Sequence, residues 1–399
     1  MISENRLNQL SYIAIWFFVI GSFMSVSLQA GFHIFLLIPI LFALKDFNFK
    51  TLSKSQIFFW LFSITCIISV MVNQDIEPRG YSTMTKAKYY FIALLAIIPV
   101  QRAFDQYIDA AKRKKLFYAM LIVATLAGVA GLIALVIGTN PISFRKACHA
   151  TRNCGMSGMY MNYSHNLGFF MSMMAGLLVY RDEVKKYVEL KWIYAAFAFN
   201  LIALYFTFTR GAWLGFLIAI PFAFLKKQKK VVIYSFFGIL LTGVFLFLAV
   251  PKVSETFTSS DRLTSNMERI GTWKAALKAV EERPIFGFGM QNFEPHSREL
   301  KEKYHINNAN FKGHAHNIFL EFLATTGIVG FSFFMLWLFF WFKEMLDRAD
   351  LVGAVMLPLI AAFVIASQTQ STFVLADNTF FMTFMYMMSQ IRFNKNYAS

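Results

Sequence analysis

Residues 116–138 read LFYAMLIVATLAGVAGLIALVIG, a stretch without a single charged residue. A helix needs about 20 mostly apolar residues to cross the hydrocarbon core of a bilayer, so this stretch is long enough. It follows directly on Lys112-Arg113-Lys114-Lys115, and basic clusters of this kind are typical of the cytoplasmic end of a membrane helix. The stretch therefore predicts a membrane-spanning helix that begins in the cytoplasm.

The rest of the chain has the same character. Of its 399 residues, 57% are hydrophobic and only 15% are charged, and the mean hydropathy is +0.51. Soluble domains average about 45–50% apolar and about 25% charged residues. The composition excludes a soluble enzyme and a nucleic-acid-binding module, although a net charge of +16 would otherwise suit nucleic acid. We attribute the excess of basic residues to cytoplasmic anchoring and to cationic groups for an anionic substrate.

Further apolar runs predict an all-α integral membrane protein with about twelve transmembrane helices. Lysine and arginine residues set the orientation: with the N-terminus inside, twenty-one fall in inner segments and seven in short outer loops. Both termini are therefore expected in the cytoplasm, and the first run is expected to be a retained helix rather than a signal peptide. The predicted spans are 10–29, 31–44, 56–72, 87–100, 116–138, 166–180, 192–209, 212–225, 231–250, 317–342, 351–367 and 379–391.

One long polar loop, residues 251–316, falls on the outer side. It separates nine predicted spans in residues 1–250 from three in residues 317–399. Apolar residues recur at helical spacing from Leu263 to Glu282, which predicts an amphipathic helix followed by a glycine-containing turn. A loop of this length on a compact membrane protein is usually functional, so we expect the active site to involve it.

Two of the three cysteines, Cys148 and Cys154, lie close together in another outer loop. In an oxidising periplasm this spacing favours a small disulfide-closed loop with a structural role. A zinc site that includes His149 or His165 is the alternative, but the sequence offers no clear set of four ligands.

Three arginines on the outer side are candidates for binding an anion. Arg210 stands beside Gly211 at a nearly loopless corner, where glycine lets another group approach closely. Arg269 lies four residues before Trp273 on one face of the loop helix, and Arg283 ends that helix. Arginine offers phosphate a planar fork of donors. The structural alternatives are a snorkelling anchor, a surface arginine over a tryptophan, and a helix C-terminal cation, respectively.

Two histidines precede the tenth predicted span, in the segment Gly313-His314-Ala-His316-Asn317. On a helix, residues two apart point in different directions, and acidic residues are sparse nearby, so we predict no metal site. A helix N-terminus disfavours a protonated imidazole, so His316 is expected to be neutral and able to act as a general base. Glu321 is expected to be a buried structural acid.

Taken in order along the chain, these motifs resemble the O-antigen ligase family over roughly residues 200–335. His316-Asn317, nine residues and Gly327-x-x-Gly330 are similar to its His-Asn-x9-Gly-x-x-Gly signature. Thr209-Arg210-Gly211-x-x-Leu214 resembles the family's Arg-x3-Leu element. Arg269-x3-Trp273 and Pro284-x-x-Gly287-x-Gly289 resemble the stretch that leads into its active-site loop. The sequence departs from the family at Phe331, where ligases usually have Gly, Thr or Tyr, and this weakens the choice of ligase over its relatives.

The resemblance implies an inverting, metal-independent glycosyltransferase that needs no cofactor. It would act at the periplasmic face of the bacterial inner membrane, moving O-antigen glycan from undecaprenyl pyrophosphate to a lipid A-core hydroxyl. Its partners would be these substrates and membrane lipid, and no nucleic acid. His316 is then expected to deprotonate the acceptor, and Arg210 and Arg269 to bind the pyrophosphate. Further candidates for substrate binding are Arg283, His314, Asn317, which would support the histidine by a hydrogen bond, and Asp377, which could orient the imidazole or a cation.

Two kinds of alternative remain open. Within the family, the same chemistry would serve an O-antigen or capsule polymerase, or a protein O-oligosaccharide ligase with Ser or Thr acceptors. An alternative of another class is a transporter of an anionic lipid or solute, in which the arginines would line a pathway. Transporters often show repeated halves and ionisable residues at mid-membrane depth. The sequence shows neither feature, so it favours the enzyme.

Overall fold

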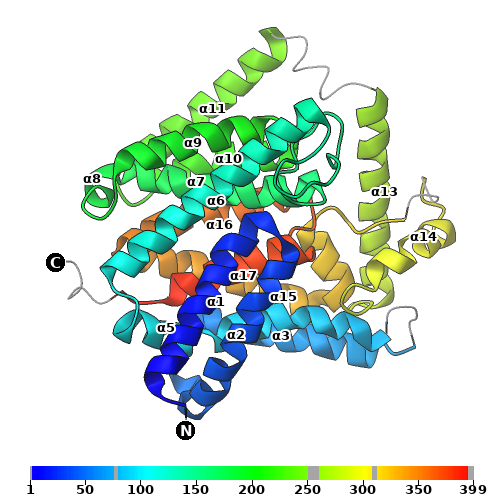
Figure 1. Cartoon of the computed structure of the whole chain (residues 1–399). Helices are drawn as coiled ribbons and strands as arrows, with labels where there is room; N and C mark the ends of the chain where they lie inside the picture. The colour runs from blue at the N-terminus through cyan, green and yellow to red at the C-terminus, as the bar shows by residue number, and fades with distance from the viewer. Residues whose placement is uncertain (1, 76–79, 250–259, 308–311, 394–399) are drawn as a thin grey trace.

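Helices form almost the whole of the protein, as a computed structural model of the chain shows (Figure 1). The structure describes residues 2–75, 80–249, 260–307 and 312–393. Within these ranges the only strand-like pairing is an isolated bridge between Thr139 and Lys146, so the prediction of an all-α protein is confirmed. The α-helices are α1 (Glu4–Met24), α2 (Val26–Ala43), α3 (Lys54–Val72), α4 (Lys88–Leu95), α5 (Ile97–Gln106), α6 (Ala110–Ile137), α7 (Tyr160–Val179), α8 (Arg181–Val184), α9 (Leu190–Tyr205), α10 (Arg210–Ala219), α11 (Lys229–Ala249), α13 (Ser260–Glu282), α14 (Phe293–Lys303), α15 (Ile318–Asp347), α16 (Leu351–Ala366) and α17 (Ala376–Gln390), and the short 3-10 helices are η1 (Leu44–Asp46), η2 (Phe49–Thr51), η3 (Gly80–Ala87) and η4 (Ile220–Phe224).

Each of the twelve predicted spans overlaps a helix or a pair of consecutive helices. Among the described residues, seven helical segments are long and apolar enough to cross a membrane, and they make the chain a multi-pass membrane protein. Three further apolar helices, Leu190–Tyr205, Arg210–Phe224 and Leu351–Ala366, are shorter. That all twelve spans cross the membrane stays a prediction.

Polar residues shift several predicted boundaries. The first predicted span runs across a helix junction, because Ser25 ends α1 and its hydroxyl accepts the N–H of Ser27 to cap α2. Helix α7 begins at Tyr160 rather than at 166, because the polar residues of its first turns are buried among protein groups instead of facing water. Residues 251–259 of the predicted loop lie outside the described residues. The predicted amphipathic helix is present as α13, whereas α14 was not predicted.

The two loop cysteines form a disulfide. Cys148 and Cys154 are bonded, with their Cα atoms 6.3 Å apart, which confirms the predicted pairing. A disulfide sulfur is not a thiolate and therefore does not serve as a zinc ligand, so the zinc alternative built on these cysteines is wrong. Asn153 anchors the loop to the bundle, because its buried amide donates to the carbonyls of Gly128 on α6 and Ala203 on α9.

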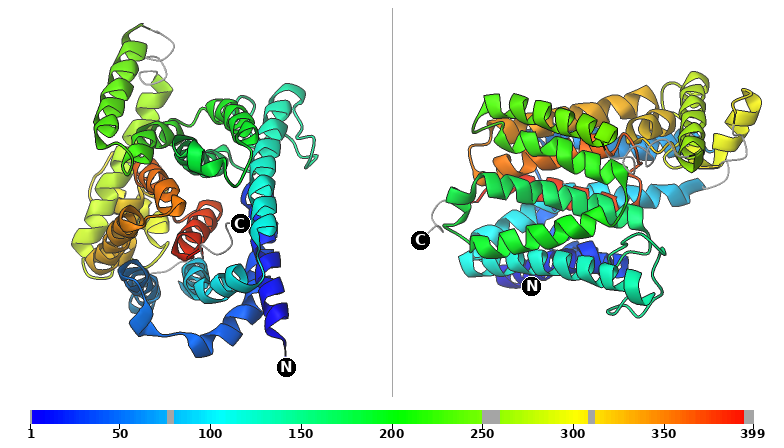
Figure 2. Two further views of the ribbon diagram at one scale, coloured as in Figure 1. Left: turned by 90° about the vertical axis from the view of Figure 1, so that its left-hand side faces the viewer. Right: turned by 90° about the horizontal axis from the view of Figure 1, so that it is seen from above.

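Helix α17 lies at the centre of the bundle, with other helices around it (Figure 2). Its residues are buried without interruption from Asp377 to Met387, and Phe and Met dominate this stretch. A helix that is apolar on all sides belongs in the interior, which explains its position. Around it α1 pairs with α2, α3 with α15, α6 with α9, and α16 with both α7 and α10.

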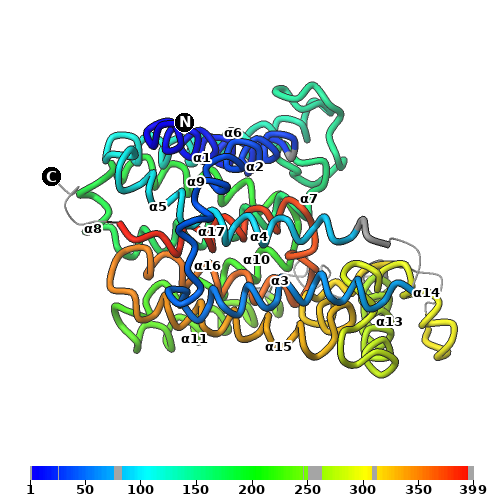
Figure 3. The backbone as a smooth tube through the Cα atoms, turned by 90° about the horizontal axis from the view of Figure 1, so that it is seen from below, coloured from blue at the N-terminus to red at the C-terminus, as the bar shows by residue number. Residues whose placement is uncertain are grey.

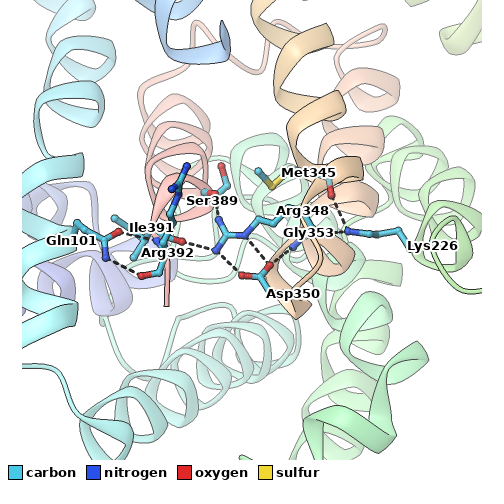
Figure 4. A network of polar contacts seen from close by, with 9 residues as sticks. All are labelled: Gln101, Lys226, Met345, Arg348, Asp350, Gly353, Ser389, Ile391 and Arg392. Carbon is cyan, nitrogen blue, oxygen red and sulfur yellow. Dashed lines mark hydrogen bonds and ion pairs between the residues drawn. The ribbon is translucent and has the colours of Figure 1, made fainter. Parts of the chain in front are cut away.

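A polar network joins three helix ends on one side of the bundle (Figure 4). Arg348, which follows α15, donates to the carbonyls of Ser389 and Ile391 at 2.6 Å each and forms an ion pair with Asp350 at 2.7 Å. Asp350 in turn caps α16, and Lys226 donates to the carbonyl of Arg348. The network therefore satisfies helix-terminal carbonyls that would otherwise lack partners.

The described parts of both termini lie on this same side. Asn8 donates to Gln106 at 2.7 Å, and the N–H of Arg392 donates to Gln101 at 2.8 Å, so both terminal segments contact α5. Helices α13 and α14 lie at the opposite end of the bundle (Figures 1 and 3). This arrangement agrees with the expectation that both termini share one side and the long loop takes the other.

The loop is fastened to the bundle at a break in α15. Gly327 has φ +64° and ψ −169° within the helix, a backbone conformation that residues other than glycine rarely adopt. The turn after α13 fits into the break: the N–H of Phe288 donates to the carbonyl of Ala324 at 2.9 Å, and the N–H of Ile328 donates to that of Pro284 at 2.8 Å. The two glycine motifs noted in the sequence therefore serve to join loop and bundle.

We expect Gly327→Ala to lower the free energy of unfolding by about 2 kcal/mol or more. Strained backbone of this kind costs about 1–3 kcal/mol, and the added Cβ would also meet the carbonyl oxygen of Ile285. Gly238→Ala on α11 is the matched control, because no atom lies within 4 Å of a Cβ built there. Thermal unfolding in detergent would check this, and equal unfolding temperatures for the two variants would contradict it.

Candidate active site

The segment with the two predicted histidines is fixed at its central residue, Ala315. The N–H of Ala315 donates to a carboxylate oxygen of Glu321 at 2.7 Å, and its carbonyl accepts the indole N–H of Trp273 at 2.8 Å. Ala315 and Glu321 are buried, which confirms the expected burial of Glu321, and its structural role stays a prediction. A buried carboxylate requires hydrogen-bond donors, so this contact is costly to break. The peptide groups on both sides of Ala315 are thus held in place by α13 and α15.

Both imidazoles meet a single amide. The Nδ1 of His316 lies 2.7 Å from the Oε1 of Gln370, the Nε2 of His314 lies 3.2 Å from the same atom, and the ring centroids are 4.2 Å apart. The prediction that the rings point apart on a helix is therefore wrong. Helix α15 begins only at Ile318, and the histidines precede it in irregular chain, where His316 has φ +49°.

The imidazole of His316 is neutral at neutral pH. Burial, the nearby His314 and the charge of Arg269 together lower the pKa of His316 to about 4, against the opposing effect of the hydrogen bond to Gln370. A neutral imidazole agrees with the sequence prediction. Its main cause is burial rather than the helix terminus that the sequence suggested.

Arg269 lies near the histidines. It is placed by α13, one turn before the Trp273 that holds Ala315, and its charge acts on both His316 and His165. Coulomb interactions weaken with distance, so these effects place Arg269 in the neighbourhood of both imidazoles. That Arg269 binds the pyrophosphate stays a prediction.

Arg210 starts α10 beside the cluster formed by His165, His314, His316 and Gln370. Its neighbour Gly211 is buried, and a Cβ on Gly211 would contact the hydroxyl of Thr369 and lie 3.6 Å from the Nε2 of His165. Thr369 directly precedes Gln370, the partner of both histidines. The close approach that was expected at Gly211 is therefore made by the segment between α16 and α17.

Asn317 has a different use from the predicted one. Its side-chain oxygen accepts the N–H groups of Phe319 and Leu320 at 3.0 and 3.2 Å, which makes it the N-cap of α15. Its amide group donates to Gln368 at 3.3 Å. The residue therefore positions the histidines by fixing where the helix begins.

Arg283 is paired at the edge of the site. Its guanidinium forms an ion pair with Asp75 at 2.5 Å and donates to the Oδ1 of Asn73 at 2.6 Å, both beyond the end of α3. No role was predicted for Asp75. The pair links the end of α13 to the bundle, so a structural contribution accounts for the position of Arg283.

Asp377 lies where α17 meets α7. Its carboxylate accepts the amide of Asn162 at 3.2 Å, and the adjacent Asn378 donates to Asn166 at 2.7 Å. These contacts hold the two helices together at Asn162, the residue that follows Met161. The sulfur of Met161 in turn contacts the amide of Gln370. Its predicted role in orienting an imidazole or a cation stays a prediction.

Sequence reasoning missed two members of the cluster. Gln370 belongs to Ser367-Gln-Thr-Gln-Ser-Thr372, an unbroken polar run between two apolar helices, and this run was the available signal. His165 had been considered only as a zinc ligand. Its ring is buried and its Nδ1 lies 2.7 Å from the carbonyl of Met161, while its Nε2 has no hydrogen-bond partner among the described residues.

A cavity of about 200 Å³ opens beside His314. Its lining combines polar and ionisable groups with apolar residues, from both the loop and the bundle. The lining residues are Lys86, Gln291, Glu294, His314, Glu321, Ser371, Val374, Leu375 and Ala376. The cluster therefore has room next to it for a polar group of a substrate.

Known proteins share this part of the chain. Residues 195–335 match the O-antigen ligase family, and this region contains Arg210, Arg269 and His316. The chain is 24% identical over 306 residues to an uncharacterised protein of Haemophilus influenzae, covering 72% of this chain and 71% of that one. It is 30% identical over 132 residues to the ComP-specific O-oligosaccharyltransferase of Acinetobacter baylyi, covering 30% of this chain and 23% of that protein. The match at residues 195–335 and the similarity to an oligosaccharyltransferase together indicate a glycosyltransferase-like enzyme that resembles the O-antigen ligases in this region.

Proposed function

We propose that this enzyme moves an oligosaccharide from undecaprenyl pyrophosphate to an acceptor hydroxyl, with lipid A-core as the acceptor. The observation that carries the proposal is the meeting of a neutral, partly buried imidazole at His316 with the guanidinium of Arg269 and the start of α10 at Arg210. A pyrophosphate leaving group needs fixed positive charge, and a hydroxyl nucleophile needs a base. The cluster offers both.

In the proposed step, the acceptor oxygen attacks the anomeric carbon from the face opposite the pyrophosphate. Its proton passes to the Nε2 of His316, the bond from the anomeric carbon to the phosphate oxygen breaks, and the electron pair stays on the pyrophosphate. Arg210 and Arg269 stabilise that charge, a role for which arginine's planar fork of donors is suited. One displacement inverts the anomeric centre. Because the cations are side chains, we assign the reaction no divalent ion and no cofactor.

The location proposed for this step is the periplasmic side of the bacterial inner membrane. The cluster lies with α13 at the end of the bundle away from both described termini (Figure 1). The distribution of Lys and Arg favours cytoplasmic termini, which puts the opposite end in the periplasm.

A protein hydroxyl is the second candidate acceptor. It is favoured by the similarity to the ComP-specific O-oligosaccharyltransferase, which covers 30% of this chain. The roles of His316, Arg210 and Arg269 are the same with either acceptor, because only the nucleophilic hydroxyl changes.

Reconstitution with a pyrophosphate-linked oligosaccharide tests the proposal. Lipid A-core, a second carrier-linked glycan and a Ser-rich protein would be offered separately, each with and without EDTA. Product on lipid A-core that is insensitive to EDTA would support the first candidate, and product on the protein would support the second. Folded protein that transfers to none of the three would contradict both.

His316→Ala should reduce turnover by at least about 10²–10⁴-fold, the usual contribution of a general base. Binding of the carrier-linked donor should be retained, since the arginines remain. His305→Ala, an exposed histidine of the same loop, is the control and should transfer normally. Product formation by mass spectrometry would measure this. Normal turnover in His316→Ala would remove the base from the mechanism.

Arg210→Lys should lose at least about tenfold in turnover, because a lysine ammonium cannot reproduce two parallel hydrogen bonds to a phosphate group. A lysine would still serve as a snorkelling anchor, so this variant separates the two explanations of Arg210. Arg145→Lys, at an exposed arginine that precedes the disulfide-closed loop, is the matched control. If Arg210→Lys and Arg145→Lys both transfer like the unaltered enzyme, Arg210 is an anchor.

The acid limb of the pH profile should differ between kcat/KM and kcat. In kcat/KM, which reports the free enzyme, activity should fall only as pH drops toward about 4, the pKa of the His316 imidazole. Bound pyrophosphate is negatively charged and favours the imidazolium, so the limb in kcat should lie at higher pH. Initial rates across pH would measure both limbs. A limb in kcat at lower pH than in kcat/KM would show that the charge of the bound pyrophosphate does not favour the imidazolium of His316.

A further inference from the structure

We propose that Gln370 is a positioning residue that sets the hydrogen-bonding form of both histidines and leaves the Nε2 of His316 as the basic atom. This inference rests on the proposed function, in which His316 removes the acceptor proton. It assigns a role to the polar run between α16 and α17, which lies outside the matched ligase domain at residues 195–335.

The orientation of the Gln370 amide follows from its neighbours. Its Oε1 faces the two imidazoles, and its Nε2 donates to the sulfur of Met161 at 3.5 Å. The reverse orientation would set the amide oxygen against the sulfur, so two acceptors would face each other. The carbonyl of Met161 is already used by the Nδ1 of His165, at 2.7 Å. The amide is therefore held in one orientation from the α7 side.

An amide oxygen accepts hydrogen bonds and does not donate them, which decides where the imidazole protons lie. The Nδ1 of His316 carries a proton and donates at 2.7 Å, and the Nε2 of His314 does the same at 3.2 Å. In a neutral imidazole the other nitrogen then has the lone pair. The basic atom of His316 is thus Nε2, and that of His314 is Nδ1.

The Gln370 amide fixes the positions of the imidazole protons without adding a charge. A carboxylate in the same place would also accept the two protons, but it would favour the imidazolium form of His316. The other ionisable groups around the two imidazoles come from six elements: Lys86 of η3, His165 of α7, Arg210 of α10, Arg269 of α13, Glu294 of α14 and Glu321 of α15. Glutamine at this position therefore orients the base without adding a charge, whereas glutamate would orient it and favour its protonation.

The first test changes the charge and keeps the shape. Gln370→Glu should raise the pKa of His316 from about 4 by about 1–3 pH units, the usual effect of an adjacent carboxylate. Diethyl pyrocarbonate reacts with neutral imidazole, so peptide mass spectrometry can follow its reaction with His316 against pH without knowledge of the acceptor. The pH at which His316 loses reactivity should move upward in Gln370→Glu. Gln368→Glu, an exposed glutamine two residues away, is the control and should move it little.

The second test removes the acceptor and keeps the volume. Gln370→Met should lower kcat at least about tenfold with little change in the KM of the donor, because the imidazole of His316 loses the partner that holds both its tautomer and its orientation. A merely structural role for Gln370 would leave the pH dependence of the remaining activity, and of the His316 reaction, unchanged.

Three outcomes separate the inference from the proposed function. If Gln370→Glu shifts the His316 reaction and Gln370→Met lowers kcat, both stand. If His316→Ala abolishes transfer while Gln370→Glu and Gln370→Met keep the original pH dependence and kcat, the role of Gln370 is overturned and the proposed function stands. If His316→Ala transfers normally, the base assignment fails, and with it the catalytic role of Gln370, whatever the chemical modification shows.

Discussion

The site depends on how the peptide groups around Ala315 are held. Its N–H is bound by a buried Glu321 and its carbonyl by the indole of Trp273, and these contacts come from two different helices. Peptide groups are planar, and the two on either side of Ala315 contain the Cα atoms of His314 and His316. Holding both peptide groups therefore fixes the positions from which the two imidazole side chains extend. The convergence of two rings on one amide, and the strained backbone of His316, are consequences of this constraint.

Features that depend on residues close together in the chain could be predicted from the sequence. Uninterrupted apolar runs predicted the helices, and spacing along the chain identified His316, Arg210 and Arg269 as candidates that the structure places around one cluster. Contacts between distant segments were not predictable in this way. Gln370 meets His316 across 54 positions, and Arg283 meets Asp75 across 208, so both pairs depend on how helices pack.

Boundaries and interior polar residues were also beyond the sequence patterns. A serine that caps a helix looks like any other residue in an apolar run, and so the junction at Ser25 was overlooked. Helix α14 was not predicted because its buried face includes the polar residues Ser297 and Lys301. The hydroxyl of Ser297 donates to the carbonyl of Glu294, and the ammonium of Lys301 donates to the hydroxyl of Thr272. Hydropathy alone cannot anticipate burial that depends on such partners.

The break at Gly327 has a consequence for how such an enzyme can diversify. Phe288 is tied to Ala324 on one side of the break, and Ala315 is tied to α13 and α15, so the chain is anchored before residue 290 and again after residue 312. Lengthening a surface loop between fixed ends costs little free energy, since each doubling adds only about 0.6 kcal/mol. The parts of residues 290–312 outside the buried face of α14 can therefore be lengthened to accept a new substrate while the reacting groups keep their places.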